Sequence, residues 1–277
     1  MLNRKRTGEL KMNLLTLEII GADETVKASN SSPLLVSIAY ERSYEPGDTI
    51  ILRSSKEKVY LVIQLDDAMN PAFVYLAEKE YRFKIPFGEK RISYSPKSFT
   101  GQLHVFTARL ATAEELSAYK NIAQNEYDQH ENTACFPHAC ANVETRGESV
   151  FAARNAINGN NLNYSHGEWP FESWGINQQD DAEITVDFGR TVEIDKVVLT
   201  LRADFPHDNY WERVTLTFSD GSKHIAQLVK THEPQPILLQ RRKVEWIKLG
   251  ELVKSADPSP FPALSQVEVF GYESGML

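Results

Sequence analysis

The residues best suited to chemistry or ligand contact lie between His166 and Trp211. Three of the chain's four tryptophans are here, beside two histidines, two arginines and several carboxylates. Most of them stand next to Pro, Gly, Asn or Asp, which mark loops rather than helices or strands. Large aromatic side chains on loops offer contact area and a defined orientation, while charged groups add directional hydrogen bonds. The mixture therefore predicts a binding surface for a polar, partly flat ligand.

Eight residues are the candidates for ligand contact: Arg146, His166, Trp169, Arg202, Asp204, His207, Asp208 and Trp211. An arginine donates paired hydrogen bonds to hydroxyls or a carboxylate, and an exposed indole stacks on an apolar ring face. A histidine beside an aspartate orients a hydroxyl or acts as a base.

Each candidate also has a purely structural interpretation. Arg202 could pair with Asp204, and Arg146 with Glu144 or Glu148. His207 and Asp208 could stabilise their own loop, and His166 has the same ambiguity. Trp211 could close the edge of a sandwich, which would leave Trp169 as the exposed indole. Two further tryptophans, Trp174 and Trp246, are predicted to lie in the core.

Composition narrows the function classes. The net charge is −8 and the isoelectric point about 5.5. No stripe of Lys and Arg is visible, so nucleic-acid binding is not expected. No apolar run is long enough to span a bilayer, and the run at residues 14–20 contains Glu18, which argues against a signal peptide. We therefore expect a soluble cytoplasmic protein with no membrane partner.

Apolar alternation and turn residues predict an all-β chain: two β-sandwich domains joined by a short α-helix. Residues 1–12 are interpreted as a disordered tail or tag. Residues 13–110 form the predicted N-terminal sandwich, whose role is scaffolding or homo-oligomerisation. Residues 111–133 form a connector helix and linker, with a capping box at Thr112 and an apolar stripe at Leu116, Tyr119 and Ile122. Residues 134–277 form the second sandwich.

Several runs in this second part, taken in order, resemble the discoidin or coagulation factor 5/8 type C sandwich, which includes the family 32 carbohydrate-binding modules. They are A-R-N-A-I-N-G at 153–159, S-W-G at 173–175, I-T-V-D-F-G at 184–189, F-S-D-G at 218–221 and A-L-S-Q-V-E-V-F-G at 263–271. The resemblance covers roughly half the chain. It implies a jelly roll whose loops bind a ligand at one end, with residues 202–211 as the principal loop.

The family often holds a structural calcium through its early loop and a late glutamate. This sequence has Asn158 and Gln266 at those two positions. Losing two carboxylates removes most of the charge that a hard cation requires, so no cofactor is expected, although calcium held by amide and backbone oxygens remains conceivable.

The run C-F-P-H-A-C at 135–140 suggests a metal site at first sight. Cys135, Cys140 and His138 supply only three ligands, and the usual spacing is absent, so no metal site is expected. Two buried free thiols are the preferred interpretation, with a disulfide or a contribution of His138 to the ligand end as alternatives.

Three functions compete. The first is non-catalytic binding of a carbohydrate or similar polar ligand by loops of the second sandwich, with no catalytic residues. The second is a sugar-active enzyme using His166, His207 and a carboxylate such as Glu168, Asp204 or Asp208, because these loops are rich in titratable groups. The third is a structural or assembly protein. We expect a binding protein rather than an enzyme.

Overall fold

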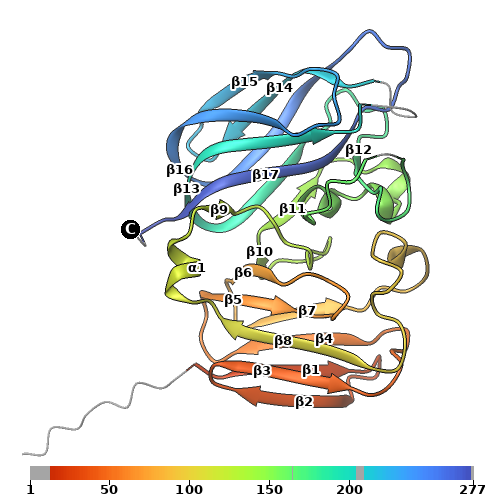
Figure 1. Cartoon of the computed structure of the whole chain (residues 1–277), viewed down its shortest axis with the longest axis vertical. Helices are drawn as coiled ribbons and strands as arrows, with labels where there is room; N and C mark the ends of the chain where they lie inside the picture. The colour runs from red at the N-terminus through yellow and green to blue at the C-terminus, as the bar shows by residue number, and fades with distance from the viewer. Residues whose placement is uncertain (1–12, 164, 204–208, 276–277) are drawn as a thin grey trace, which may run out of the picture.

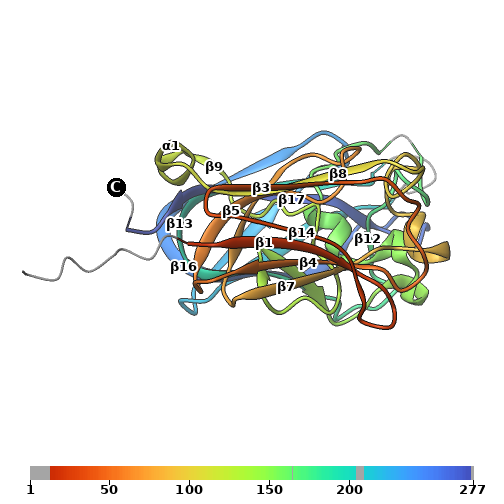
Figure 2. The same cartoon turned by 90° about the horizontal axis from the view of Figure 1, so that it is seen from below.

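The computed structural model describes residues 13–163, 165–203 and 209–275 and contains two β-sandwiches, stacked along the long axis of the molecule (Figure 1). Figure 2 shows the same arrangement from below. The prediction of an all-β fold built from antiparallel sheets is confirmed.

The first sandwich consists of a four-stranded sheet in the order β2-β1-β4-β7 and a five-stranded sheet in the order β10-β6-β5-β8-β3. Its strands are β1 (Leu15–Ile20), β2 (Val26–Ser32), β3 (Leu35–Tyr40), β4 (Thr49–Ser54), β5 (Val59–Gln64), β6 (Ala72–Leu76), β7 (Glu80–Lys84), β8 (His104–Leu110) and β10 (Cys135–Phe136). Alternation explains the packing: in β3, Val36, Ile38 and Tyr40 are buried while the residues between them face outward. Burying each such aliphatic side chain stabilises the fold by about 1.5–3 kcal/mol.

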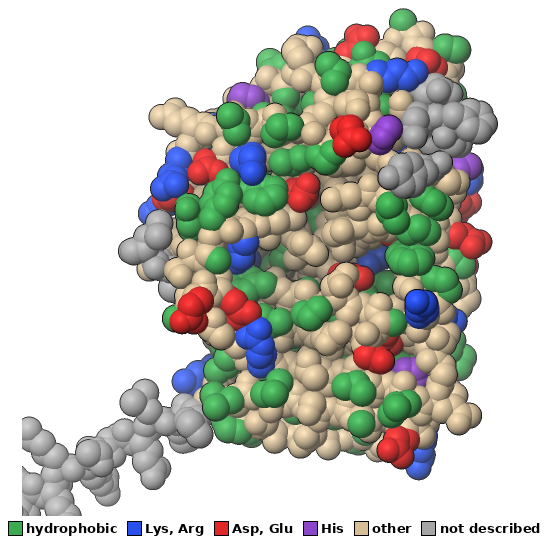
Figure 3. All heavy atoms as spheres, in the orientation of Figure 1, with side chains coloured by type: hydrophobic (Ala, Val, Ile, Leu, Met, Phe, Trp, Pro, Cys, Tyr) green, Lys and Arg blue, Asp and Glu red, His purple; other side chains and the backbone are tan. Residues whose placement is uncertain are grey.

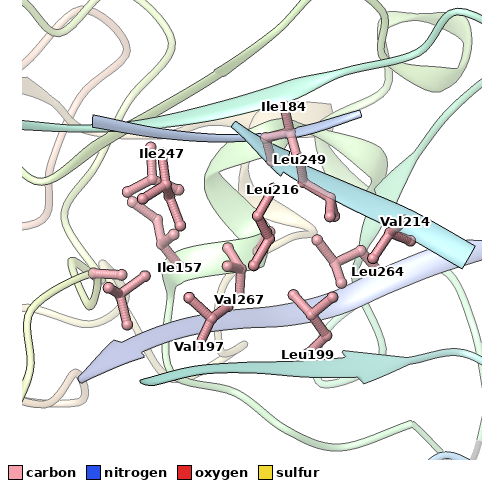
Figure 4. Close-up of a cluster of buried hydrophobic side chains, with 14 of the residues drawn as sticks. Ile157, Ile184, Val197, Leu199, Val214, Leu216, Ile247, Leu249, Leu264 and Val267 are labelled. Carbon is pink, nitrogen blue, oxygen red and sulfur yellow. The ribbon is translucent and has the colours of Figure 1, made fainter. Parts of the chain in front are cut away.

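The second sandwich is one continuous eight-stranded hydrogen-bonded sheet, folded over its own apolar face. Its strands are β9 (Lys120–Asn121), β11 (His138–Ala141), β12 (Trp174–Gly175), β13 (Ile184–Leu201), β14 (Trp211–Phe218), β15 (Lys223–Gln227), β16 (Gln235–Lys254) and β17 (Ala263–Glu273). Aliphatic side chains from β13, β14, β16 and β17 meet in its core (Figure 4).

The long strand β13 contributes to both layers of the second sandwich. This is possible because its register with β16 breaks between Asp187 and Val192. Gly189 lies in this break with a φ of 64°, and a Cβ there would come within 2.4 Å of the Phe136 ring. Only glycine satisfies both the left-handed backbone and the close approach of the ring.

Helix α1 (Ala113–Ser117) is shorter than the sequence pattern predicts. The capping box is confirmed: Thr112 Oγ1 accepts from the Glu115 backbone, and Glu115 accepts from the Thr112 backbone. The helix nevertheless ends at Ser117, so the helical stripe through Tyr119 and Ile122 is wrong. The chain becomes extended there because β9 pairs with β17 at the edge of the second sandwich.

The predicted domain boundary remains a prediction, since strands cross it in both directions. β9, which falls in the predicted linker, joins the second sandwich, and β10, which falls in the predicted second domain, joins the first. A buried ion pair of the second sandwich lies where the two sandwiches meet. Arg190 Nε and Nη2 lie 2.7 and 2.6 Å from the Glu273 carboxylate. The same guanidinium lies over the rings of Tyr60 and Tyr75, at 5.4 and 5.2 Å.

The four remaining short helices are 3₁₀ turns: η1 (Gly88–Arg91), η2 (Thr145–Gly147), η3 (Ser149–Phe151) and η4 (Ala153–Ile157). Charged side chains of both signs are interspersed over the face in Figure 3. Within the described residues, no helix has the length and apolarity needed to cross a membrane.

Candidate functional site

A cavity of about 300 Å³ lies among the loops at one end of the second sandwich. Its walls come from four separate segments: η2 together with the end of η3, His166, residues 175–178 from the end of β12 onward, and residues 261–263, which lead into β17. The lining is mainly apolar, with Phe151, Ile176 and Phe261 beside the polar groups of Arg146 and His166. This combination is typical of small-ligand sites.

A second, more open cleft of about 600 Å³ adjoins the first. Arg146, Phe151 and His166 line both and form the boundary between them. Trp169 lies in the cleft with 38% of its surface exposed, and Ile92 of the first sandwich's long β7–β8 connection lines it as well. We call the two spaces together the rim site.

The backbone around the first cavity adopts an uncommon conformation. Arg146, Asn177 and Gln178 have φ values of 54°, 48° and 61°, and all three line this cavity. Left-handed φ in residues other than glycine costs about 1–3 kcal/mol each and concentrates at ligand sites. Thr145 Oγ1 accepts a hydrogen bond of 2.9 Å from the Asn177 backbone, which holds two of the loops together.

Arg146 pairs with Glu148, as one sequence interpretation suggested. Its Nε and Nη2 lie 2.5 and 2.9 Å from the two carboxylate oxygens of Glu148. Hydrogen bonds from Arg146 lower the pKa of Glu148. Since 62% of the arginine side chain is exposed, solvent screens the pair and its donors can be shared with a ligand.

His166 lies between the two parts of the rim site. Burial, and then the charge of Arg202, lower the pKa of His166 below its ordinary value of 6.5. The imidazole is therefore neutral at neutral pH, with one nitrogen that donates and one that accepts. A neutral histidine of this kind suits a hydroxyl, which also donates and accepts.

Trp169 is held by its backbone rather than by its indole. The Trp169 N–H donates to the Ile92 carbonyl at 2.9 Å. The position of this loop is thus tied to the first sandwich, and a role of the ring as an aromatic platform stays a prediction.

Two sequence candidates are corrected. Arg202 is only 1% exposed, and its Nη1 donates to the Phe171 carbonyl, so it supports the wall of the cleft from behind. Trp211 is also 1% exposed and packs 6.1 Å from Trp174 in the core, where it cannot stack on a ligand. Trp174 is buried as predicted, whereas Trp246 is half-buried rather than in the core.

Three more candidates, Asp204, His207 and Asp208, lie outside the described residues. The described ends of their loop are well anchored. The Arg202 N–H donates to the Ala263 carbonyl at 3.0 Å, and Asn209 Nδ2 donates to the carbonyls of Asp257 and Ser259 at 3.1 and 2.6 Å. Ala263 itself lines the first cavity, so this loop leaves the core beside the rim site.

The sequence reasoning missed Phe151, Asn177, Gln178, Phe261 and Ile92. Phe261 stands between two prolines, so the rule that singled out loop aromatics would have found it. Ile92 carried no such signal, because only the packing of the two sandwiches brings it to the rim.

The loop that resembles a calcium site does not fit a cation. Gln266 Nε2 donates to three oxygens, those of Asn155 O at 2.6 Å, Asn158 Oδ1 at 2.8 Å and Ser265 O at 2.6 Å. A cation bound to the same oxygens would need the position that this amide group occupies. Gln266 Oε1 in turn accepts from the Gly159 N–H at 2.9 Å, so both ends of the amide are engaged.

A buried carboxyl completes this closed cluster, which consists of Asn155, Asn158, Asn160, Glu172 and Gln266. Glu172 Oε1 accepts from Asn158 Nδ2 at 2.7 Å and from Asn160 Nδ2 at 3.1 Å. Burial raises the pKa of Glu172, although these hydrogen bonds oppose the shift.

The two cysteines are both free thiols, but only Cys135 is buried. The expectation of two buried thiols is therefore wrong for Cys140, which lies on the exposed face of β11. His138 Nδ1 donates to Asp128 Oδ1 at 2.8 Å, and His138 lines neither hollow of the rim site. Among the described residues, no group of three or more His, Cys, Asp or Glu side chains could hold a metal ion.

No family model and no curated protein matches the sequence. Solved structures match about half of it. The family 32 carbohydrate-binding module of C. perfringens NanJ, solved with galactose, is 16% identical, with 55% of this chain and 99% of that one covered and a TM-score of 0.40.

Two further matches are similar. A chitosan-binding module of a chitosanase/glucanase from Paenibacillus sp. IK-5 is 19% identical over 55% of this chain and 98% of its own, with a TM-score of 0.37. The lectin domain of lectinolysin, solved with Lewis B antigen, is 21% identical over 55% and 96%, with a TM-score of 0.41. These are modules of the class that the sequence motifs resemble.

Proposed function

We propose that the rim site binds a carbohydrate or a similar polar ligand without catalysis. The observation that carries the proposal is the convergence of Arg146, His166 and Trp169, from separate loops, around two connected hollows. An exposed indole offers a face for a sugar ring. The guanidinium and the neutral imidazole supply donors and an acceptor for hydroxyl groups.

The strained backbone supports the same interpretation. Of the seven described non-glycine residues with positive φ, three line the first cavity: Arg146, Asn177 and Gln178. Solvent-open sites of this kind bind sugars with about 4–8 kcal/mol, which corresponds to millimolar to micromolar dissociation constants.

The enzyme alternative has one observation in its favour, because Glu148 and Glu168 both line the cleft beside His166. A general acid needs a raised pKa, however, and the hydrogen bonds from Arg146 lower the pKa of Glu148. Glu148 is therefore poorly suited as a general acid, and the enzyme alternative depends on Glu168.

The test is retention on an array of immobilised neutral and acidic mono- to tetrasaccharides, including galactose-, fucose- and glucosamine-containing glycans. We expect Trp169→Ala and Arg146→Ala to lose at least tenfold in affinity for the glycans that the unmodified chain retains. Each variant has a matched control. Tyr119→Ala removes another exposed aromatic, 42% exposed, and Arg241→Ala breaks another exposed ion pair, the one with Glu193.

The proposal fails if the unmodified chain retains no glycan, or if the rim variants bind as well as the controls. Release of a hydrolysed product from a retained glycan, abolished by Glu168→Gln, would favour the enzyme instead. If the rim variants change only the mass of the assembly in solution, a structural role would be supported.

A further inference from the structure

The cleft beside the first cavity is built from both sandwiches. Ile92 comes from the connection between β7 and β8 of the first sandwich, whereas Val150, Trp169 and Phe171 come from the second. In Figures 1 and 2 this connection lies on the same side of the molecule as the loops that precede and follow β12. The first sandwich therefore contributes directly to the rim site.

Hydrogen bonds at two places hold the β7–β8 connection of the first sandwich against the loops of the second. On one side the Trp169 N–H donates to the Ile92 carbonyl at 2.9 Å. On the other, the Ser149 N–H donates to Glu89 Oε1 at 3.0 Å and the Ser149 hydroxyl donates to the Glu89 carbonyl at 2.7 Å. These contacts tie η1 to η3 and to the Trp169 loop.

The wall is also anchored from behind. The buried Arg154 side chain lies 4.2 Å from the centre of the Tyr94 ring, on the same connection as Ile92. Arg154 Nε donates to the Asp128 carbonyl at 2.8 Å and Nη2 to the Glu126 carbonyl at 3.0 Å. A buried guanidinium with this many partners resists displacement, so the two sandwiches present the cleft as one preformed surface.

We propose that this cleft is a second subsite, so that the ligand of the rim site is an oligosaccharide of at least two units that extends onto the first sandwich. The inference rests on the proposed function. The two hollows, of about 300 and 600 Å³, each reach the size of small-ligand sites. They share the wall formed by Arg146, Phe151 and His166, so groups bound in the two hollows lie next to each other, as linked sugar units do.

The division of residues suggests how the subsites differ. The first cavity is the more enclosed, and all its lining residues belong to the second sandwich. The cleft is more open and is lined by the aromatic ring of Trp169, the aliphatic side chain of Ile92 and the carboxylates of Glu148 and Glu168. A pyranose in the cleft would find apolar contacts along Trp169 and Ile92, and the carboxylates would accept from its hydroxyls.

The experiment is isothermal titration calorimetry of the full chain with two ligand series: galactose with its β-linked di- and tetrasaccharide, and glucosamine with chitosan oligomers of two and four units. In the series that binds, we expect the tetrasaccharide to bind at least tenfold more tightly than the monosaccharide. Ile92→Arg, which places a long side chain in the cleft, should remove this gain, so that the ratio of tetrasaccharide to monosaccharide affinity falls toward one. Ile92→Ala reduces the gain without filling the cleft.

Leu103→Arg is the matched control, since it places the same charge at an exposed position, 60% exposed, in the same connection. Thermal unfolding of each variant verifies that it is folded, and Ile92→Ala tests the inference if Ile92→Arg is not. Equal affinity for monosaccharide and tetrasaccharide, or a length dependence that both Ile92 variants retain, overturns the second subsite and leaves the proposed function standing. Absence of binding to every member of both series overturns both proposals.

Discussion

Two groups of polar loop residues in the second sandwich differ in what their side chains contact. In the closed cluster, the side chains of Asn155, Asn158, Asn160 and Gln266 are hydrogen-bonded to their own loops and to one another. In the rim site, Arg146, His166 and Trp169 line open space, and Arg146 also pairs with Glu148. Polar residues on loops therefore indicate a ligand site only where the fold places them along a hollow.

The largest effect is expected at the centre of the closed cluster. Gln266→Glu replaces a donating amide by a carboxylate that faces the oxygens of Asn155, Asn158 and Ser265. A buried, uncompensated charge costs about 3–5 kcal/mol, so chemical denaturation in EDTA should show a loss of this size. Millimolar calcium should restore part of the loss, because the substitution replaces the donors by an anionic ligand.

The unmodified chain is expected to show the same unfolding midpoint in calcium and in EDTA. Gln240→Glu, the same change at an exposed position, is the control and should lose far less. A calcium-dependent midpoint for the unmodified chain would mean that the amide of Gln266 does not replace a cation. The closed cluster would then be a ligand site too, and it would no longer differ from the rim site.

A smaller effect is expected at Glu126, beside the closed cluster. Burial raises the pKa of Glu126 from 4.5 to about 7, although a hydrogen bond from the Asn70 backbone opposes the shift. The folded state therefore holds a proton that the unfolded state has lost, so stability falls as the pH rises from 4.5 to about 7. The loss is at most roughly 3 kcal/mol.

Glu126→Gln should flatten that part of the stability profile, measured by urea unfolding from pH 4 to 8. Glu78→Gln, at an exposed turn between β6 and β7, serves as the control and should leave the slope unchanged. A slope that survives Glu126→Gln would show that the junction between the sandwiches solvates this carboxyl.

Local patterns were enough to predict the strands and the capping box. Alternation at residues 184–188 gave the first part of β13, because burial on one face repeats every second residue. The length of α1 was not predictable in this way. Whether residues 118–122 stay helical depends on β9 pairing with β17, which is distant in sequence.

The candidate site shows the same limit. Trp169 and Trp211 both belong to segments rich in turn-forming residues, since Pro170 follows Trp169 and Asp208-Asn209 lie just before Trp211. Their fates differ because Trp211 begins β14 and meets Trp174 inside the sandwich, while Trp169 stays on a loop bonded to Ile92. The sequence also revealed the missing carboxylates at Asn158 and Gln266, but not the hydrogen bonds that replace them.

The smallest effect concerns the strained backbone of the rim site. Gln178 is exposed, has a φ of 61° and lines the first cavity. Gln178→Gly relieves the left-handed strain, so we expect a gain of roughly 0.5–1 kcal/mol in stability by chemical denaturation. The same substitution removes a side chain from the cavity wall and should weaken glycan binding.

Lys58→Gly sharpens this last comparison, because Lys58 has a φ of 60° in a turn before β5, away from the rim site. Both substitutions should stabilise the chain by a similar amount, but only Gln178→Gly should lower affinity in the same calorimetric titration. If the two variants bind alike, the left-handed residues at the cavity serve the turn alone. If only Gln178→Gly both raises stability and lowers glycan affinity, the left-handed backbone at Gln178 lowers the stability of the chain but places a side chain that contacts the ligand.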